Sequence, residues 1–438
     1  MENINQYLGG RITLKNSLDL DTINYLNQIG VKEVPGIEQL NEIRYRCNRC
    51  ISEFNKVNFK SKMIYCRNCI NLGRIKLGDQ ILVSNADVNF EMNLNPLYWL
   101  GELTTLQKRV SQELLESYKL QENHLVWAVT GAGKTEIIFP LLKQAIMDGK
   151  RVAICSPRLD VCNELYPRLK SAFPDTSMSI SHGKIEDNYH MTQVLIATVH
   201  QLIKFSKAFD LLIIDEVDAF PLNGNQVLWN AIQKSQSANA SVIYLSATPP
   251  TNLLDEVSAN KLNLSKLYQR FHGRSLPLPK LKLLLRNSLF MNVNPRIRYL
   301  INQWIKSNTR GLIFFPDIEH MNRFYLNLKK IYPDIKINQV HSKDPQRIEK
   351  IQKFRDSEVD ILLTTTILER GVTFKQIDVI VIHADSARYS KMALIQIAGR
   401  VGRDSVPGSD KIYFFYNQYN KNISGAVKEI KRMNRLIK

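Results

Sequence analysis

A short glycine-rich turn constrains the fold of this chain more than any other feature of its sequence. Residues 124–129 are apolar and strand-like, the turn TGAGKT occupies 130–135, and a helical pattern continues through residue 147. A strand, a glycine turn and a helix in this order are typical of a phosphate-binding loop in an open α/β sheet. The candidate ATP-binding residues are Thr130, Gly131, Ala132, Gly133, Lys134 and Thr135.

The turn predicts specific roles for its residues. Gly131 and Gly133 allow backbone N–H groups to close around phosphates. Lys134 is expected to bridge the β- and γ-phosphates, and the Thr135 hydroxyl to ligate Mg²⁺. The usual pattern GxxxxGK[ST] begins with glycine, where this chain has Ala128, so the match to the bare pattern is incomplete.

A second apolar run, 211–214, ends in the acidic sequence DEVD at 215–218. A carboxylate at the end of a strand beside the phosphate-binding loop can reach the Mg²⁺ shell, and its neighbour can polarise water. We therefore assign Asp215 to Mg²⁺ and Glu216 to activation of the attacking water. A solvated acidic turn is the alternative, and the upstream glycine turn disfavours it.

Strands and helices alternate along most of the chain, which predicts doubly wound parallel sheets. The expected strands are 151–156, 194–198 and 241–246, and then 311–316, 335–340, 359–363, 378–384 and 411–416. The second group of strands has no phosphate-binding loop of its own. We therefore expect ATP to bind between two lobes and the second lobe to supply cationic groups.

The sequence QIAGRVGR at 396–403 supplies Gln396, Arg400 and Arg403, with Arg403 the first choice for an arginine finger. A pair of surface arginines is the alternative.

Four of the six cysteines form two C-x2-C pairs separated by fifteen residues. This spacing predicts a tetrahedral four-thiolate zinc site, and two disulfides are the alternative. The ligands would be Cys47, Cys50, Cys66 and Cys69. Residues 44–76 also carry nine Lys or Arg, one acid and interleaved aromatics. These aromatics either stack on nucleic acid or pack around the zinc knuckles, and the sequence leaves both readings open.

Net charge and hydropathy indicate which kind of partner and which cellular location to expect for this protein. The formal net charge is +18, which favours a polyanionic partner over simple solubilisation. We find no apolar run of membrane-spanning length and no apolar signal-peptide core. These features predict a cytoplasmic protein, and peripheral docking at the inner face of the membrane stays open.

The ordered set of motifs resembles the core of a superfamily 2 helicase or translocase, from about residue 103 to residue 403. Further motifs are Leu103-Thr104 with the adenine-reading Gln107, SPR at 156–158, ATVH at 197–200, SAT at 246–248, LIFFP at 312–316 and TTT at 364–366. The resemblance implies two RecA-like lobes. It also implies phosphate contacts to a nucleic acid strand from Arg158, Thr198, Thr365 and Thr366.

The sequence QIAGRVGR at 396–403 resembles motif VI of these proteins. It begins with glutamine, a feature in which the chain resembles the DNA-acting branch that includes PriA. The cysteine module, RFHG at 270–273, LPLP at 276–279 and DEVDAFP at 215–221 resemble the ComFA family of competence ATPases. The resemblance implies single-stranded DNA import beside a membrane DNA-uptake channel, with a ComFC-type partner. A PriA-like replication-restart or repair helicase and a non-catalytic zinc scaffold are the alternatives. We identify no wedge element, so we favour translocation over unwinding.

The expected organisation is α/β, with two RecA-like doubly wound parallel-sheet lobes and an N-terminal four-cysteine zinc-binding module. The expected parts are an N-terminal segment (1–40), the zinc module (41–80), lobe 1 (81–255), a proline-rich linker (256–292), lobe 2 (293–420) and a basic C-terminal helix (421–438). The helix has an apolar side that suits core packing, DNA contact or anionic lipid.

Overall fold

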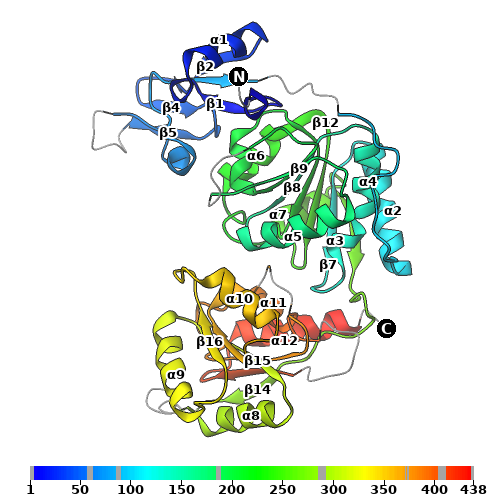
Figure 1. Cartoon of the computed structure of the whole chain (residues 1–438), viewed down its shortest axis with the longest axis vertical. Helices are drawn as coiled ribbons and strands as arrows, with labels where there is room; N and C mark the ends of the chain where they lie inside the picture. Colours follow the sequence, from blue (N-terminus) through cyan, green and yellow to red (C-terminus); the bar gives the residue numbers. More distant parts are fainter. Residues whose placement is uncertain are drawn as a thin grey trace. The chain divides into compact units, whose positions relative to one another are not determined.

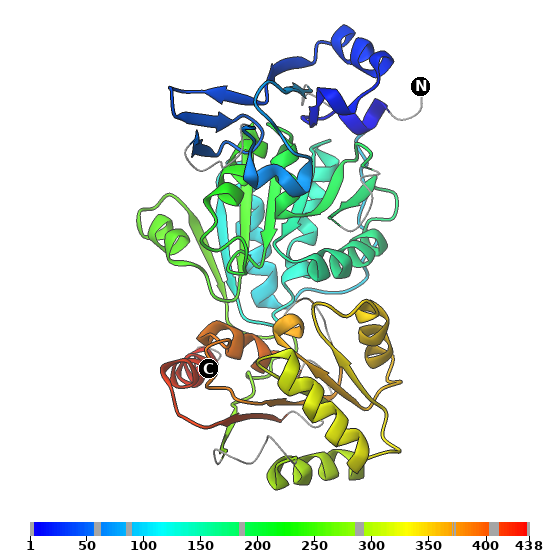
Figure 2. The same cartoon turned by 90° about the vertical axis from the view of Figure 1, so that its left-hand side faces the viewer.

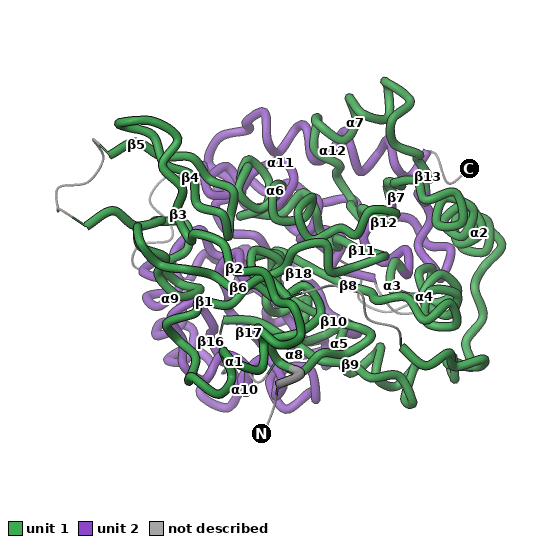
Figure 3. Tube along the Cα trace, turned by 90° about the horizontal axis from the view of Figure 1, so that it is seen from above, with its two compact units in different colours: residues 1–127, 134–266 green, residues 128–133, 267–438 purple. Residues whose placement is uncertain are grey.

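The structure is a computed structural model, which describes residues 4–56, 63–84, 90–183, 189–284, 293–369, 371, 374–402 and 411–435. The chain divides into two compact units (Figure 3). The first comprises residues 1–127 and 134–266, and the second comprises residues 128–133 and 267–438. The loop 128–133 thus groups with the second unit, although the strand before it and the helix after it belong to the first.

The amino-terminal part of the first unit contains two small antiparallel sheets. In one sheet β6 lies between β1 and β2, and in the other β4 lies between β3 and β5. The elements are β1 (Ile12–Leu14), α1 (Leu20–Gln28), β2 (Lys32–Pro35), β3 (Ile37–Gln39), β4 (Arg44–Cys47), β5 (Glu53–Asn55), the 3-10 helix η4 (Arg67–Leu72) and β6 (Gln80–Val83). Residues before 40, expected only as an N-terminal segment, therefore supply part of both small sheets.

The segment before β1 is held against the rest of the first unit. The Ser206 N–H donates to the Gly10 carbonyl at 2.8 Å, and Gly10 has a φ of +75°. A Cβ at this position would lie 2.4 Å from the Ser206 carbonyl oxygen, so only glycine allows the approach. The buried Arg151 guanidinium donates to the Gly9 carbonyl and to the Tyr189 hydroxyl.

A large parallel sheet forms the rest of the first unit, in the order β13-β7-β12-β11-β8-β10-β9. The neighbouring pairs from β7 to β9 are parallel, and helices lie on both faces (Figure 1). The strands are β7 (His124–Ala128), β8 (Val152–Ser156), β9 (Met178–Ser181), β10 (Val194–Thr198), β11 (Phe209–Asp215), β12 (Gln236–Ser246) and β13 (Asn263–Leu267). The helices are α2 (Thr105–Lys119), α3 (Lys134–Ile137), α4 (Phe139–Met147), α5 (Leu159–Ala172), the 3-10 helix η5 (Val199–Lys204), α6 (Gln226–Ser235) and α7 (Thr251–Ser258).

One hydrophobic core joins the cysteine module to the large sheet. Its buried side chains include Tyr45 and Ile75 of the module, Leu212 and Tyr244 of the sheet, and Ile232 of α6. Burying a side chain of this size contributes roughly 1.5–3 kcal/mol to the free energy of unfolding. The continuous core therefore holds the cysteine module against α6 and the large sheet. Parallel strands also bring their carboxyl ends to a single edge, where loops carry function.

The second unit has a parallel sheet in the order β14-β19-β18-β15-β17-β16. Helices α8 and α9 lie together on one of its faces (Figures 1 and 2), where their buried side chains share a core with alternate strand residues. The strands are β14 (Lys280–Leu283), β15 (Arg310–Phe314), β16 (Ile337–Val340), β17 (Ile361–Thr364), β18 (Ile377–Val381) and β19 (Ile412–Tyr416). The helices are α8 (Pro295–Lys306), α9 (Ile318–Ile331), α10 (Arg347–Arg355), the 3-10 helix η6 (Thr366–Leu368), α11 (Lys391–Ala398) and α12 (Lys421–Arg435).

The segment 256–292, expected to be a linker, contributes to both large sheets. Its strand β13 lies at one edge of the first sheet, and β14 pairs in parallel with β19 at one edge of the second. The proline-rich stretch between these two strands contains no helix or strand.

The C-terminal helix packs on the second unit. Its buried residues are Ile423, Ala426, Ile430 and Met433, and Lys391 of α11 forms an ion pair with Glu429 at 3.2 Å. Leu436 and Ile437, expected on its apolar side, lie outside the described residues. Among the described helices, none combines the length and the apolar character needed to cross a bilayer.

Candidate functional site

The glycine turn adopts the backbone conformation that its sequence requires. Gly131 and Gly133 have φ values of +84° and +77°, which are in the left-handed region open to glycine. The Ala132 N–H donates to the Val129 carbonyl at 3.1 Å. The expected helix is interrupted, because α3 ends at Ile137 and α4 begins at Phe139, with a proline in its first turn. Proline lacks the N–H that would continue the hydrogen-bond ladder of α3.

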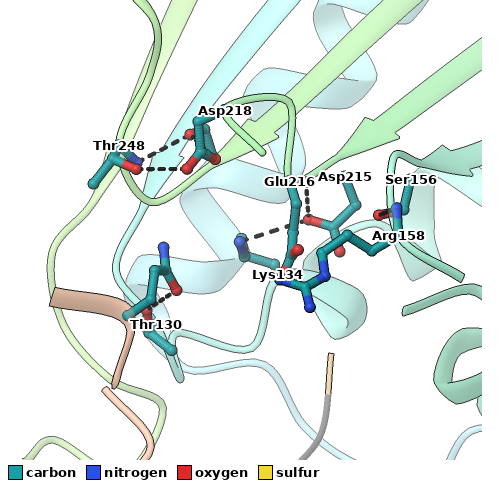
Figure 4. A network of polar contacts seen from close by, with 10 residues as sticks. Thr130, Lys134, Ser156, Arg158, Asp215, Glu216, Asp218 and Thr248 are labelled. Atoms are coloured by element: carbon teal, nitrogen blue, oxygen red, sulfur yellow. Dashed lines mark hydrogen bonds and ion pairs between the residues drawn. The ribbon is translucent and has the colours of Figure 1, made fainter. Parts of the chain in front are cut away.

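Lys134 lies beside the acidic turn, within the first unit (Figure 4). Its Nζ atom is 3.6 Å from Asp215 Oδ1, and the two side chains are 18% and 14% exposed. Thr135 is buried at the next position. Asp215 is the last residue of β11, which pairs with both β12 and β8. The sheet therefore brings together the residues that the sequence assigned to phosphate and Mg²⁺.

Glu216 has a strained backbone. Its φ is +54°, which is uncommon for a residue with a Cβ, and its N–H donates to Asp215 Oδ1 at 2.8 Å. Such conformations cost about 1–3 kcal/mol and persist where the surroundings enforce them, often at active sites. With this conformation at Glu216, the chain leaves β11 and enters a turn immediately after Asp215.

The acidic turn is tied to the end of the neighbouring strand β12. The carboxylate of Asp218 accepts hydrogen bonds from the Ser246 and Thr248 hydroxyls, both at 2.7 Å (Figure 4). All three side chains are buried. Two buried hydrogen bonds therefore join the acidic turn to residues 246–248, although nothing in the sequence alone marks Asp218 as their partner.

Gln396 and Arg400 both contact neighbouring motifs in the second unit. The Thr130 hydroxyl donates to Gln396 Oε1 at 3.0 Å. A Cβ at Gly399 would lie 2.6 Å from Thr130 Cβ, so glycine is needed for this approach. The Arg400 Nε donates to the Glu369 carbonyl at 3.0 Å, with Arg400 only 3% exposed. Arg403, the expected arginine finger, lies outside the described residues.

Gln107, assigned to adenine recognition, lies in the capping box that begins α2. Its Oε1 accepts from the Thr104 N–H at 2.9 Å, while its own N–H donates to the Thr104 hydroxyl. Gln107 is 4% exposed. The capping box fixes the start of the helix and the position of this amide.

The candidate nucleic-acid contacts lie at the carboxyl ends of strands. Arg158 follows β8 and Thr198 ends β10, and these two strands pair in parallel with Ser156 opposite Thr198. Figure 4 shows Arg158 extending toward the acidic turn. In the second unit, Thr365 and Thr366 directly follow β17. In the first unit, Arg158 and Thr198 thus lie at the same carboxyl edge of the sheet as Asp215.

The four cysteines converge within the amino-terminal module. Their sulfur atoms lie within 4.8 Å of one another, and all four side chains are buried. The Cys47–Cys69 and Cys50–Cys66 sulfur distances are 3.8 and 3.4 Å. Zinc–sulfur bonds of about 2.3 Å place tetrahedral sulfurs about 3.8 Å apart, whereas a disulfide needs about 2.05 Å. The donor set therefore fits zinc and does not fit disulfides.

Two cations accompany the four sulfurs. The Arg49 Nε donates to Cys69 Sγ at 3.4 Å, and its other nitrogens donate to the Cys69, Leu72 and Gly73 carbonyls. Lys234 of α6 donates to the Arg49 carbonyl and, at 2.9 Å, to the Ile203 carbonyl. Four thiolates around Zn²⁺ carry a net charge of about −2, which these two cations offset.

The surroundings shift the pKa values of this cluster. Burial lowers the pKa of Lys234 to about 8, while the Cys50 thiolate opposes that effect. A hydrogen bond with Cys47 lowers the pKa of the Cys50 thiol. A hydrogen bond with Cys50 raises the pKa of the Cys47 thiol, and a hydrogen bond with Cys47 raises the pKa of the Cys66 thiol. Zinc binding requires all four as thiolates, so it would release protons from the thiols whose pKa is raised.

The aromatic side chains of the module are accounted for in part by packing. Tyr45 is 3% exposed and stacks on Phe54 with ring centroids 6.1 Å apart. The Arg74 guanidinium lies over the Tyr65 ring at 5.2 Å. Phe59 lies outside the described residues. Tyr45 and Phe54 therefore belong to the core that supports the cysteines.

The fold and the site together define a helicase-like ATPase with two RecA-like lobes. Residues 104–257 match the DEAD/DEAH box helicase family, and residues 294–405 match the helicase conserved C-terminal domain. Residues 1–83 match the family described as the competence protein ComFA N-terminal domain. The chain belongs to the ComFA family.

Two relatives match along most of their length. This chain is 36% identical to competence protein ComFA of Bacillus subtilis over 91% of this chain and 87% of that protein. It is 39% identical to competence protein ComFA of Streptococcus pneumoniae over 89% of this chain and 90% of that protein.

Solved structures confirm the predicted fold class. The DEAD-box helicase Mss116 bound to single-stranded RNA and UDP-BeF superposes with a TM-score of 0.59 at 18% identity, covering 75% of this chain and 77% of that one. Dbp5 of S. cerevisiae bound to RNA and ADP BeF3 superposes with a TM-score of 0.57 at 16% identity, covering 76% and 88%. At these identities the likeness concerns the fold alone.

Proposed function

We propose that this protein couples ATP hydrolysis to the movement of single-stranded DNA during DNA uptake in competence. The observation that carries the proposal is the convergence of Lys134, Asp215 and Glu216 at one sheet edge, on a chain of the ComFA family. Arg158 and Thr198, on neighbouring strand ends, are our candidate contacts to the DNA backbone. Contacts to the phosphate backbone confer little sequence preference, which suits the uptake of DNA of any sequence.

The residues of this chain have separable roles toward ATP. Lys134 exchanges its Asp215 partner for the β- and γ-phosphates, and the backbone of 130–133 encloses the phosphates. Thr135 and Asp215 offer the hydroxyl and carboxylate oxygens that suit Mg²⁺, which when bound neutralises phosphate charge. Glu216 orients and deprotonates the attacking water. Gln396, Arg400 and Arg403 are proposed to stabilise the transferring phosphoryl group.

Coupling between ATP and DNA is proposed to run through the strand ends. Asp215 ends β11 and Arg158 follows the paired strand β8, and the Asp218 carboxylate accepts hydrogen bonds from two hydroxyls at the end of β12. Reorganisation of the acidic turn on hydrolysis would therefore change the position of groups on both sides of β11. Thr365 and Thr366 are the proposed DNA contacts of the second unit.

The cysteine module is proposed to bind one structural zinc ion through Cys47, Cys50, Cys66 and Cys69. The closed donor set leaves no position for a substrate, which is typical of structural rather than catalytic zinc.

The net charge of +18 supports binding to DNA. Association with a ComFC-type protein and with the membrane uptake channel, at the inner face of the membrane, completes the proposal.

Steady-state phosphate release tests the ATPase part of this proposal. We expect turnover to rise with poly-dT and to rise less with poly-rU or duplex DNA. Raising the salt concentration from roughly 50 to 200 mM should weaken DNA activation steeply, because phosphate contacts release counterions. The absence of ATP hydrolysis with and without DNA would favour the zinc scaffold.

Displacement of streptavidin from the biotinylated end of a DNA strand tests translocation itself. We expect displacement that requires ATP and a single-stranded track. DNA-stimulated hydrolysis without displacement from either end would contradict translocation. Robust separation of a forked duplex would favour a restart or repair helicase.

A further inference from the structure

Arg270 contacts the end of α11 through its guanidinium group. Its Nη2 donates to the Gly399 carbonyl at 3.0 Å and to the Val401 carbonyl at 2.9 Å, and its Nη1 donates to the Gly402 carbonyl. The residue is 2% exposed and is among the largest fully buried side chains of the described chain. Gly399 is the C-cap of α11, and its carbonyl carries part of the negative charge of a helix C-terminus, which stabilises a buried cation there.

The same residue also contacts the glycine turn. A Cβ built at Gly131 would meet the Arg270 Nε at 3.5 Å and its Cγ at 3.7 Å, so the arginine side chain lies along this glycine. The next residue, Phe271, donates its N–H to the Gly131 carbonyl at 3.1 Å. Two residues earlier in the turn, the Val129 N–H donates to the Leu267 carbonyl at 3.0 Å. Residues 267–271 thus follow the backbone of the phosphate-binding loop.

Arg270 therefore joins two segments that already touch. Thr130 donates to Gln396 and packs against Gly399, and Arg270 holds the turn 399–402 immediately after that contact. A planar guanidinium can serve several carbonyls at fixed angles, which a lysine ammonium cannot do. Without these hydrogen bonds, three buried carbonyls lose their charged donor, and the turn is free to shift relative to Thr130.

We propose that Arg270 is a positioning residue for ATP hydrolysis, which fixes the end of α11 against the phosphate-binding loop so that Gln396 and Arg400 keep their places. The inference rests on the proposed hydrolysis of ATP at this loop. It predicts that loss of Arg270 slows the turnover of bound ATP more than it weakens ATP binding.

The test compares Arg270→Met and Arg270→Lys with a matched control, Arg310→Met, in the full-length protein. Arg310 also donates to two backbone carbonyls, those of Phe354 and Lys375, but it starts β15 and so lies at the opposite end of that strand from the carboxyl edge. The readouts are kcat, KM, the Kd of a fluorescent ATP analogue, and the thermal melting midpoint of each variant.

We expect Arg270→Met to lower kcat roughly ten-fold or more while the nucleotide Kd changes by less than about three-fold. Arg270→Lys should show a smaller loss of kcat, and Arg310→Met should keep the wild-type kcat. If Arg270→Met does not fold, folded Arg270→Lys decides the matter by the same kcat and Kd comparison. Wild-type kcat in the folded Arg270 variants, or a loss confined to nucleotide binding, would overturn the proposal. A wild-type protein that hydrolyses no ATP would instead overturn the proposed function.

Discussion

The hydroxyl of Thr130 donates a hydrogen bond to the amide oxygen of Gln396 at 3.0 Å, although 266 residues separate them in the chain. Thr130 opens the glycine turn and Gln396 opens motif VI. The close approach of Thr130 to Gly399 accounts for the glycine that follows Gln396 by three positions. Two motifs that the sequence suggested separately are therefore parts of one packed structure.

Replacing Lys134 by alanine should abolish ATP turnover. The variant removes the ammonium that lies 3.6 Å from Asp215 and that we assign to the phosphates. We expect kcat to fall by at least about a hundred-fold, since charged groups at a transferring phosphoryl group contribute several kcal/mol. Phosphate release measures this, with the exposed Lys261→Ala as the control. Turnover close to wild type in Lys134→Ala would show that the ATP site lies elsewhere.

Glu216→Gln should separate ATP binding from hydrolysis. The substitution preserves the shape of a side chain on a strained backbone with φ +54° and removes only the basic oxygen. We expect turnover to fall about 10²–10⁴-fold while ATP remains bound, because general-base catalysis has this magnitude. Retention of radiolabelled ATP after gel filtration is the measurement. Rapid hydrolysis by this variant would assign the base to another residue.

Cys47→Ala should lose the zinc ion and destabilise the amino-terminal module. A tetrahedral site with three thiolates and no fourth ligand binds zinc less tightly, and the module shares its core with the large sheet. Metal analysis and thermal melting of the purified variant are the measurements. Cys155→Ala is the matched control, since Cys155 is equally buried but lies outside the cluster. Full zinc content in Cys47→Ala would refute the four-thiolate assignment.

Lys234→Met should accelerate zinc release without removing any zinc ligand. The ammonium of Lys234 reaches the Arg49 carbonyl between the first two cysteines and offsets part of the charge of a zinc–tetrathiolate centre. We expect zinc transfer to a chromophoric chelator to quicken by roughly ten-fold, as for other outer-shell partners of metal sites. Lys261→Met supplies the control for a lost surface charge. Identical release from wild type and Lys234→Met would remove Lys234 from the zinc centre.

Burial of His124 predicts a loss of stability at acid pH. Burial lowers the pKa of His124 to about 4 from 6.5, against the opposing charges of Glu113 and Glu122. Its ring nitrogens each lie 2.8 Å from a serine hydroxyl, those of Ser117 and Ser265. The unfolded chain therefore binds the proton more readily between pH 6.5 and 4, so the free energy of unfolding should fall as pH falls through this window. The contribution is at most roughly 3 kcal/mol.

Denaturant titrations from pH 7 to pH 4 measure this effect. His124→Asn should reduce the pH dependence, since asparagine does not titrate. The control is His341→Asn, which removes an imidazole from the second unit and should not abolish the pH dependence that His124 causes. A pH profile that His124→Asn does not alter would assign the acid sensitivity to other groups.

Features that depend on a few neighbouring residues could be predicted from the sequence. Glycines at 131 and 133 predict the left-handed turn, and the C-x2-C spacing predicts converging thiols, because backbone conformation and ligand reach are local properties. The apolar runs predicted the central strands of both parallel sheets, because buried strands need apolar side chains on both faces. The structure shows the same strands with shifts at their ends, and the largest is at β12, which begins at Gln236 and not at Ser241.

The way in which these local parts meet follows from the packing of distant segments and could not be predicted from the sequence. Sheet order placed β11 between β12 and β8, which puts the Asp215 carboxylate beside Lys134 and ties Asp218 to the end of β12. Arg270 and Lys234 reach carbonyls 129 and 185 residues away, and no local pattern marks either residue as a partner. Their roles depend on strand register and shared burial, which bring groups distant in the chain within hydrogen-bonding distance only when the segments pack together.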